Sequence, residues 1–199
     1  MTIQEGKLIY HLTALENVPC ILKYGLLPRN QIRNFIPNFT DVADPEIITF
    51  RGENDLNDFI PFHFFCKNPF DGRVQIKYPT SRFVYLCVHR EYARQQNYKI
   101  ITQHPMSFLE ALNLYDYDEG FELIDWEAME KRDYADNHSK NVCMAECIAP
   151  SVVWGNELFC IYVKTEEDER WINRQCLSVG IQNPCRINIM SGMFYNYNP

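Results

Sequence analysis

Short apolar segments, separated by irregular intervals, dominate the chain. Two polar stretches read as helices, one over 127–132 starting near Asp125 and one over 166–177. The sequence has no regular alternation of strand and helix and no glycine-rich phosphate loop, which argues against Rossmann and P-loop folds. The pattern therefore predicts an α+β fold whose strands fall at residues 8–12, 82–89, 99–102, 142–148, 158–163 and 186–190.

The chain has the composition of one globular domain. Of its 199 residues, 46% are hydrophobic and 23% charged, and no repeat or low-complexity linker occurs. We expect a single domain over residues 1–199. The longest apolar runs are far shorter than the roughly 20 residues that a membrane helix needs. The N-terminus lacks the features of a signal peptide, so we expect a cytoplasmic protein that does not span a membrane.

Local signals near the N-terminus indicate a helix and then a loop. The helix begins either at Thr13, the first residue of a T-x-x-E capping box, or at Asn17, with Pro19 in its first turn. Gly25 is a natural residue to end it. Residues 28–58 are rich in Asn, Asp, Pro and Gly and predict a long, partly irregular loop.

The eight cysteines favour packing over metal binding. No CxxC pair occurs, and the closest two are Cys143 and Cys147. In a strand these would lie about 13 Å apart, which is too far for a shared tetrahedral zinc. Several of the cysteines also sit in apolar runs, where a free thiol behaves as a small hydrophobe. We predict no metal site.

Charge is distributed unevenly along the sequence. The net charge is -7, yet segment 67–99 carries seven basic and two acidic residues, a balance of +5. Segment 110–136 carries ten acidic and two basic residues, a balance of -8. A chain of this kind can present a cationic face to a nucleic acid or an anionic cofactor. On charge alone, two solvated faces that partly neutralise each other are an equally good interpretation.

Glu146 is the most informative anomaly. It lies in segment 141–149, which is otherwise apolar on both faces of the predicted strand. A carboxylate buried there costs several kcal/mol unless it is paired, hydrogen-bonded or open to a cleft. The alternative is an edge-strand glutamate that points to water, and the pattern alone does not decide between the two.

Three further residues have suitable chemistry but weak individual signals. His11 and Thr13 sit at a strand-to-helix junction, where an imidazole, a hydroxyl and free backbone N–H groups can converge on a polar ligand. Arg51 offers a planar fork that suits phosphate. Taken singly, each is more often structural or solvated.

The combination of segments is far more specific than any one of them. Residues 10–27 keep His11, Thr13, Asn17, Pro19 and Gly25 in one register, and they are followed by segments 58–64, 68–70, 124–129 and 144–148. In this order the segments resemble the DarT family of DNA ADP-ribosyltransferases, and the resemblance runs from about residue 8 to residue 195. Lys67 stands where the family commonly has arginine, and Cys143 and Met144 stand where it commonly has arginine and glutamine.

The resemblance implies both a fold and an activity. The fold is an ADP-ribosyltransferase-like split antiparallel sheet with flanking helices, and NAD is the co-substrate, with no metal. ADP-ribose is transferred to a thymine or guanine of single-stranded DNA with release of nicotinamide. Such an enzyme is the toxin of a toxin–antitoxin pair, and its partner is a cognate macrodomain antitoxin.

The matched positions also imply roles for individual residues. His11, Thr13 and Asn17 would hold the nicotinamide and ribose end of NAD, and Arg51 would clamp phosphate. Glu146 would be the catalytic carboxylate, with Arg51 and, less directly, His104 beside it. We expect DNA contacts from Lys67, Phe70 and Lys140.

Two alternatives remain at this point. The same fold could act on RNA, protein or water, releasing nicotinamide without a DNA adduct. The chain could instead be a non-catalytic nucleotide or single-strand binding module, in which loss of Glu146 would leave binding unchanged. The joint presence of His11, Arg51 and Glu146 argues against the second alternative.

Overall fold

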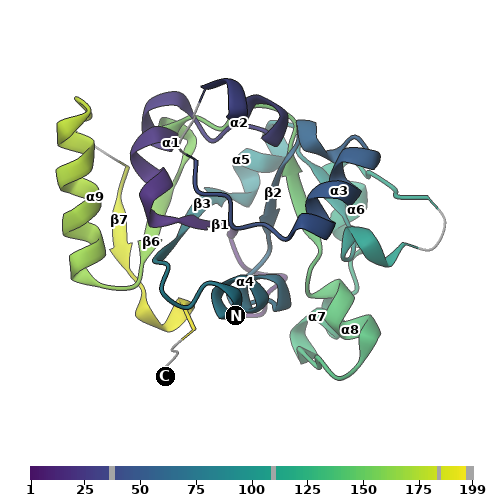
Figure 1. Cartoon of the computed structure of the whole chain (residues 1–199). Coiled ribbons are helices and arrows are strands. Elements are labelled where there is room, and N and C mark those ends of the chain that lie inside the picture. Colours follow the sequence, from purple (N-terminus) through teal and green to yellow (C-terminus); the bar gives the residue numbers. More distant parts are fainter. Residues whose placement is uncertain (36–38, 109–110, 183–184, 196–199) are drawn as a thin grey trace.

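The computed structural model describes residues 1–35, 39–108, 111–182 and 185–195. Within these residues, seven strands form one sheet in the order β4-β5-β2-β1-β3-β6-β7 (Figure 1). Its strands are β1 Leu8–Ala14, β2 Ile60–His63, β3 Phe83–His89, β4 Lys99–Ile101, β5 Glu146–Ala149, β6 Cys160–Val163 and β7 Ile187–Ile189. The predicted α+β class is confirmed.

The pairing is antiparallel except at one end of the sheet. All neighbouring strands pair antiparallel apart from β6 and β7, which run parallel. The long helix α9 (Glu166–Ser178) connects these two strands, and a parallel pair requires a crossover of this kind. The resemblance implies an antiparallel sheet, and the structure departs from it at this edge, where β6 and β7 run parallel.

The sheet opens between its two central strands. β1 pairs with β3 at seven positions, from Leu8 opposite His89 to Ala14 opposite Phe83, but with β2 at only one, Tyr10 opposite His63. Beyond that position β1 and β2 separate, so β2-β5-β4 and β1-β3-β6-β7 behave as two halves joined at one point. This is the predicted split of the sheet, and the imidazole of His11 spans it by donating from Nδ1 to the Pro61 carbonyl at 2.8 Å.

Helices flank the sheet on both faces and at its ends. In Figure 1, α9 stands beside β7 at one end of the sheet, while α7 (Trp126–Lys131) and α8 (Asn137–Val142) lie beyond the opposite end. The other helices are α1 Val18–Tyr24, α2 Arg29–Phe35, α3 Pro45–Glu53, α4 Pro69–Lys77, α5 Arg90–Gln95 and α6 Tyr117–Leu123. Short 3₁₀ turns cover Leu15–Asn17, Leu56–Asp58, Pro105–Ser107, Gly155–Glu157 and Ser191–Met193. No helix in the described part of the chain has the length and apolar character needed to cross a bilayer.

Two N-terminal predictions need correction. Thr13 does not cap a helix, because it is a buried residue of β1. α1 instead follows Asn17, with Pro19 in its first turn and Gly25 at its end with a positive φ of 85°, as the second alternative predicted. Segment 28–58 is not a loop throughout, since it contains α2 and α3.

The sequence does not predict α3 because the apolar residues of this helix show weak helical periodicity. It begins with a strong local signal, however. The Asp44 side chain accepts a hydrogen bond from the Glu46 amide at 3.1 Å, and Pro45 fills the first turn. The chain then turns back through Leu56 into β2, so α3 lies close to the open part of the sheet.

The predicted strand over 142–148 is wrong in its first half. α8 continues to Val142, and the chain then turns, with the Ala145 amide bonded to the Val142 carbonyl at 3.0 Å. β5 begins only at Glu146, which pairs with His63 on one side and Ile101 on the other. Glu146 therefore lies on an interior strand and is 6% exposed, which excludes the edge-strand alternative.

The cysteines are distributed through the core. All eight are free thiols, and six of them are buried, Cys143 in the turn before β5 rather than in a strand. Among the described residues, no group of three or more His, Cys, Asp or Glu side chains is placed to hold a metal ion.

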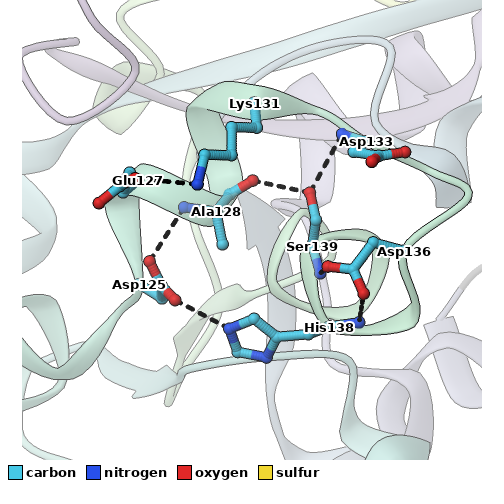
Figure 2. Close-up of polar contacts among 8 residues, drawn as sticks. All are labelled: Asp125, Glu127, Ala128, Lys131, Asp133, Asp136, His138 and Ser139. Carbon is cyan, nitrogen blue, oxygen red and sulfur yellow. Dashed lines mark hydrogen bonds and ion pairs between the residues drawn. The ribbon is translucent and has the colours of Figure 1, made fainter.

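A polar network holds the α7–α8 hairpin that leads into β5 (Figure 2). Asp125 caps α7 by accepting from the Ala128 amide at 2.9 Å, as its predicted start implied, and its other oxygen lies 2.8 Å from His138 Nε2. The buried Ser139 hydroxyl donates to the Ala128 carbonyl at 2.7 Å and accepts from the Asp133 amide at 3.1 Å. The Ser139 side chain thus joins α8 to α7 and to the segment between the two helices.

We expect Ser139→Ala to destabilise the protein by about 1–3 kcal/mol, because it leaves a buried carbonyl without its donor and an amide without its acceptor. Denaturant unfolding measures this change. Ser178→Ala is the matched control, since that hydroxyl makes a single exposed bond to the Gln175 carbonyl. Equal losses in the two variants would contradict the assigned role of Ser139.

The bridging imidazole gives the protein a pH-dependent stability. Burial lowers the pKa of His11 to about 4. An unfolded histidine has a pKa of about 6.5, so the unfolded chain binds more protons between these two values. Stability should therefore fall as the pH drops from about 6.5 to about 4, by up to roughly 3 kcal/mol from this group.

Comparing the unfolding free energies of the wild type and His11→Gln across that pH window isolates the effect. The wild type should lose stability relative to the variant on acidification. NMR of the imidazole nitrogens should also show His11 neutral at pH 5. A midpoint near 6.5 for this ring would contradict the account.

Candidate functional site

A cavity lies where β1 and β2 separate. It has a volume of about 850 Å³, including its open mouth, and its walls are mostly apolar. A mainly apolar pocket with a few convergent polar groups is typical of a small-molecule site. The polar side chains of the wall include His11 and Thr13 of β1, His63 of β2, Arg51 of α3 and Glu146 of β5.

A buried ion pair forms one wall of the cavity. Arg51 Nη1 lies 2.7 Å from Glu146 Oε2, and each residue is 6% exposed. Arg51 Nη2 also donates to the Leu56 carbonyl at 3.3 Å, which fixes the guanidinium from behind. α3 and β5 are thereby joined across 95 residues of sequence. The result is a carboxylate held in one orientation, facing an apolar space.

The predicted NAD-binding residues of the N-terminal segment divide into two groups. His11 and Thr13 line the cavity. Asn17 does not line the cavity, and its side-chain amide instead bonds to two residues that do. It donates to Thr13 Oγ1 at 3.1 Å and to the Thr40 carbonyl at 2.9 Å, and it accepts from the Thr40 amide at 2.9 Å. Asn17 therefore fixes the segment around Thr40, which itself lines the cavity.

His104 lies near Glu146 without lining the cavity. Its backbone amide donates to the Asn141 carbonyl at 2.9 Å, which ties it to the turn before β5. Burial lowers the pKa of the His104 ring, while the negative charge of Glu146 acts in the opposite direction. His104 thus interacts electrostatically with Glu146 without lining the cavity, and its catalytic role stays a prediction.

Of the three residues predicted to contact DNA, one lines the cavity and two do not. Phe70 lines the cavity itself. Lys67 has a positive φ of 62°, and its Nζ lies 5.4 Å from the centre of the Tyr195 ring. Lys140 lies in a second hollow beside α4, together with Arg73 and two tyrosines. Pro69 lines this hollow and Phe70 lines the cavity, so α4 contributes to both depressions.

Sequence reasoning missed two functional candidates. Arg29 of α2 lines the cavity and is paired with Asp41, Nη2 to Oδ1 at 3.1 Å. His63 lines the cavity from β2. It is the one ionisable residue in the apolar run 59–65, and that signal could have identified it.

The comparisons with known proteins agree with this geometry. Residues 10–195 match the family described as ssDNA thymidine ADP-ribosyltransferase, DarT. No curated protein matches the chain.

Solved structures of two bacterial proteins share the fold. DarT of Thermus sp. 2.9 in complex with ADP-ribosylated ssDNA is 19% identical, with a TM-score of 0.79 over 98% of this chain and 99% of that one. The same protein with NAD+ gives 18% identity and a TM-score of 0.74 over 96% and 98%.

The second protein is Thermosipho africanus DarTG in complex with ADP-ribose. It is 21% identical, with a TM-score of 0.75, and the match covers 98% of this chain and 52% of that one. The family match spans nearly the whole chain and includes every residue of the cavity wall. The chain therefore belongs to the DarT family of ssDNA thymidine ADP-ribosyltransferases.

Proposed function

We propose that this chain transfers ADP-ribose from NAD to thymidine in single-stranded DNA and that the reaction takes place in the cavity at the sheet opening. The observation that carries the proposal is the buried pair of Arg51 and Glu146 facing that cavity, in a chain of this family. The NAD+ and ADP-ribosylated-DNA complexes of the Thermus protein, which has the same fold, support it.

The cavity walls suit the parts of NAD. The apolar side chains offer a surface for the flat nicotinamide ring, and His11 and Thr13 stand at the same wall. The Nδ1 of His11 is bonded to a carbonyl, so in the neutral ring Nε2 is an acceptor. Arg29 and Arg51 supply positive charge for the diphosphate, and the two contacts that fix Arg51 leave other N–H groups of its fork available.

Glu146 has the position and the orientation to stabilise the transition state. Breaking the bond between nicotinamide and ribose develops positive charge on the ribose. A carboxylate that is already oriented in a water-poor site stabilises this charge without reorganising during the reaction. Arg51 acts mainly through Glu146, because it holds the carboxylate at 2.7 Å.

The surface beside the cavity suits a single strand. A base must leave its stack to enter a cavity, which favours single-stranded DNA. Phe70 at the wall offers a ring on which the base can stack, and Lys67, just before α4, and Lys140, in the second hollow, would supply positive charge to the flanking phosphates. Arg73 and Lys77 of α4 lie in the same hollow, where both pair with Asp44 at 3.1 and 3.8 Å.

The biological context is part of the same proposal. A bulky adduct on a template base blocks replication, so the activity is toxic unless it is reversed. The printed name DarTG of the Thermosipho protein supports a toxin that acts with a partner. We propose that this chain is a single-domain cytoplasmic toxin whose partner is a macrodomain antitoxin.

The test is mass spectrometry of a mixed-sequence single-stranded oligonucleotide incubated with NAD and the protein. The wild type should add one ADP-ribose, and fragmentation should place it on thymidine. Glu146→Gln keeps the shape and a partner for Arg51 but removes the charge, so the transfer rate should fall by about 10²–10³-fold. Its NAD affinity should stay close to that of the wild type.

Glu119→Gln on the exposed face of α6 is the control and should match the wild type. Nicotinamide release without a DNA adduct would contradict the DNA acceptor and point to RNA, protein or water. Intact NAD in every reaction would contradict enzymatic activity altogether.

A further inference from the structure

Lys67 and Phe70, two of the three residues proposed to contact DNA, lie between the end of β2 and the first turn of α4. Phe70 lines the cavity, and its ring is centred 5.4 Å from the ring of His63. Lys67 has a φ of 62°, in the left-handed region that residues with a side chain rarely adopt. Such a conformation persists only where the surroundings hold it, so the contacts of Lys67 decide where this turn lies.

The amide of Lys67 is held by a buried carboxylate. Asp71 of α4 is 1% exposed, and its Oδ2 accepts from the Lys67 amide at 3.0 Å. The same oxygen accepts from Asn68 Nδ2 at 3.0 Å and from Tyr85 Oη at 2.8 Å. These donors offset the cost of burying the charge, and they tie the turn to α4 and to β3.

The carbonyl of Lys67 is held by a second residue, which comes from the end of the described chain. Tyr195 Oη donates to this carbonyl at 3.0 Å, and the centre of the Tyr195 ring lies 5.4 Å from Lys67 Nζ. Lys67 Nζ also donates to the Gly192 carbonyl at 3.4 Å. Tyr195 therefore contacts both the backbone and the charged group of Lys67.

Tyr195 is itself anchored through its backbone. Its amide donates to Gln75 Oε1 at 3.2 Å, and its carbonyl accepts from Lys164 Nζ at 2.9 Å. The preceding residue, Phe194, is 2% exposed, and its ring is centred 5.1 Å from the ring of Tyr85. The segment that ends at Tyr195 is thus fixed to α4 and to the core at β3.

The close approach of Tyr195 requires a glycine in α4. A Cβ on Gly72 would lie 2.9 Å from Tyr195 Oη and 3.1 Å from its Cζ. The tyrosine ring would have to move, and its hydroxyl would then leave the Lys67 carbonyl. A glycine inside a helix costs stability relative to alanine, and the space for Tyr195 gives Gly72 a reason to be there.

We propose, resting on the proposed function, that Asp71 and Tyr195 are positioning residues for the acceptor strand. Asp71 holds the amide of Lys67 and Tyr195 holds its carbonyl, and together they set the turn that carries the Lys67 ammonium and leads to Phe70. Neither residue lines the cavity, so each acts on DNA through Lys67 and Phe70. The groups proposed to bind NAD come from β1, α2 and α3, so the contribution is specific to the acceptor.

The test measures the KM for a thymidine oligonucleotide separately from the affinity for NAD. Tyr195→Phe keeps the ring but removes the donor to the Lys67 carbonyl, and it should raise this KM by about 3–10-fold, the effect of one lost hydrogen bond. The kcat at saturating oligonucleotide and the Kd of NAD should stay close to the wild-type values. Asp71→Ala removes the acceptor of the Lys67 amide and should raise the same KM.

Tyr92→Phe is the matched control for Tyr195→Phe. It also removes a tyrosine hydroxyl with a hydrogen-bond partner, in this case Glu157, and Tyr92 does not line the cavity. The KM of this variant for the oligonucleotide should equal that of the wild type.

A double-mutant cycle separates positioning through this contact from general disturbance of α4. Gly72→Ala should raise the KM for the oligonucleotide as Tyr195→Phe does, because its methyl group displaces the hydroxyl. In the Tyr195→Phe background the same change should add little, since the hydrogen bond is already absent. Residues that act through one contact show this departure from additivity.

Three outcomes would overturn the proposal. The first is a wild-type KM in both Tyr195→Phe and Asp71→Ala. The second is a loss of NAD affinity as large as the rise in KM, which would indicate distortion of the whole cavity. The third is full additivity of Gly72→Ala and Tyr195→Phe.

Failure of the proposed function gives a different result. If the wild type forms no adduct, the fluorescence anisotropy of a labelled single-stranded oligonucleotide still measures its binding to the protein. Tyr195→Phe and Asp71→Ala should then weaken this binding, whereas Tyr92→Phe should not. Equal binding by all the variants would contradict the positioning role itself.

Discussion

The separation of β1 from β2 is the constraint on which the rest of the structure depends. Two neighbouring strands that pair at one position only, Tyr10 with His63, leave backbone groups along both strands without the usual ladder partners. Part of this deficit is met by a side chain, since His11 donates to the Pro61 carbonyl. The remaining space becomes the cavity. The fold thus gives up sheet hydrogen bonds in order to hold a ligand-sized space at its centre.

The buried pair of Arg51 and Glu146 depends on this opening and is difficult to explain by stability alone. Burying two charges costs about as much as their attraction returns, so apolar residues of the same volume often serve stability equally well. Here the pair is 6% exposed at both residues and faces the cavity. Its position makes sense if the carboxylate must be both desolvated and oriented, which are the two properties that electrostatic catalysis requires.

The supporting elements explain how the chain meets that requirement. α3 is started by Asp44 and Pro45 and ends near Leu56, whose carbonyl holds the guanidinium of Arg51 from behind. On the other side, the Ser139 network fixes the α7–α8 hairpin, and the turn after it delivers Glu146 to the first position of β5. The geometry of the Arg51–Glu146 pair therefore rests on contacts between segments far apart in sequence.

Local signals account for the parts of the fold that the sequence predicts well. β3 and α9 have long, consistent patterns, and Asp125, Pro19 and Gly25 mark helix ends by their own chemistry. The sequence does not predict α2 and α3 because they lie in a segment rich in Asn, Asp, Pro and Gly, and because the apolar residues of α3 have weak helical periodicity. The strand before Glu146 was predicted too long because an apolar turn packed in the core has the same composition as a strand.

Prediction of the site is limited in the same way, because local patterns do not contain non-local contacts. His11, Thr13, Arg51 and Glu146 were identified by resemblance and do meet in one cavity. Whether Glu146 was buried or at an edge depended on strand order, which is a non-local property that no pattern within 141–149 contains. Asn17 and His104 do not line the cavity, and His63 is recognised as the neighbour of Glu146 only from the register of β2 and β5.

The central claim is that NAD and the acceptor base meet at Glu146 inside the opening of the sheet. The most direct measurement is a crystal structure of Glu146→Gln with NAD and a short thymidine-containing single strand. The account predicts the nicotinamide-bearing carbon of the ribose next to residue 146, with the thymine ring beside Phe70 and His63. NAD bound in another hollow of the surface, or a thymine that stays outside the cavity, would contradict it.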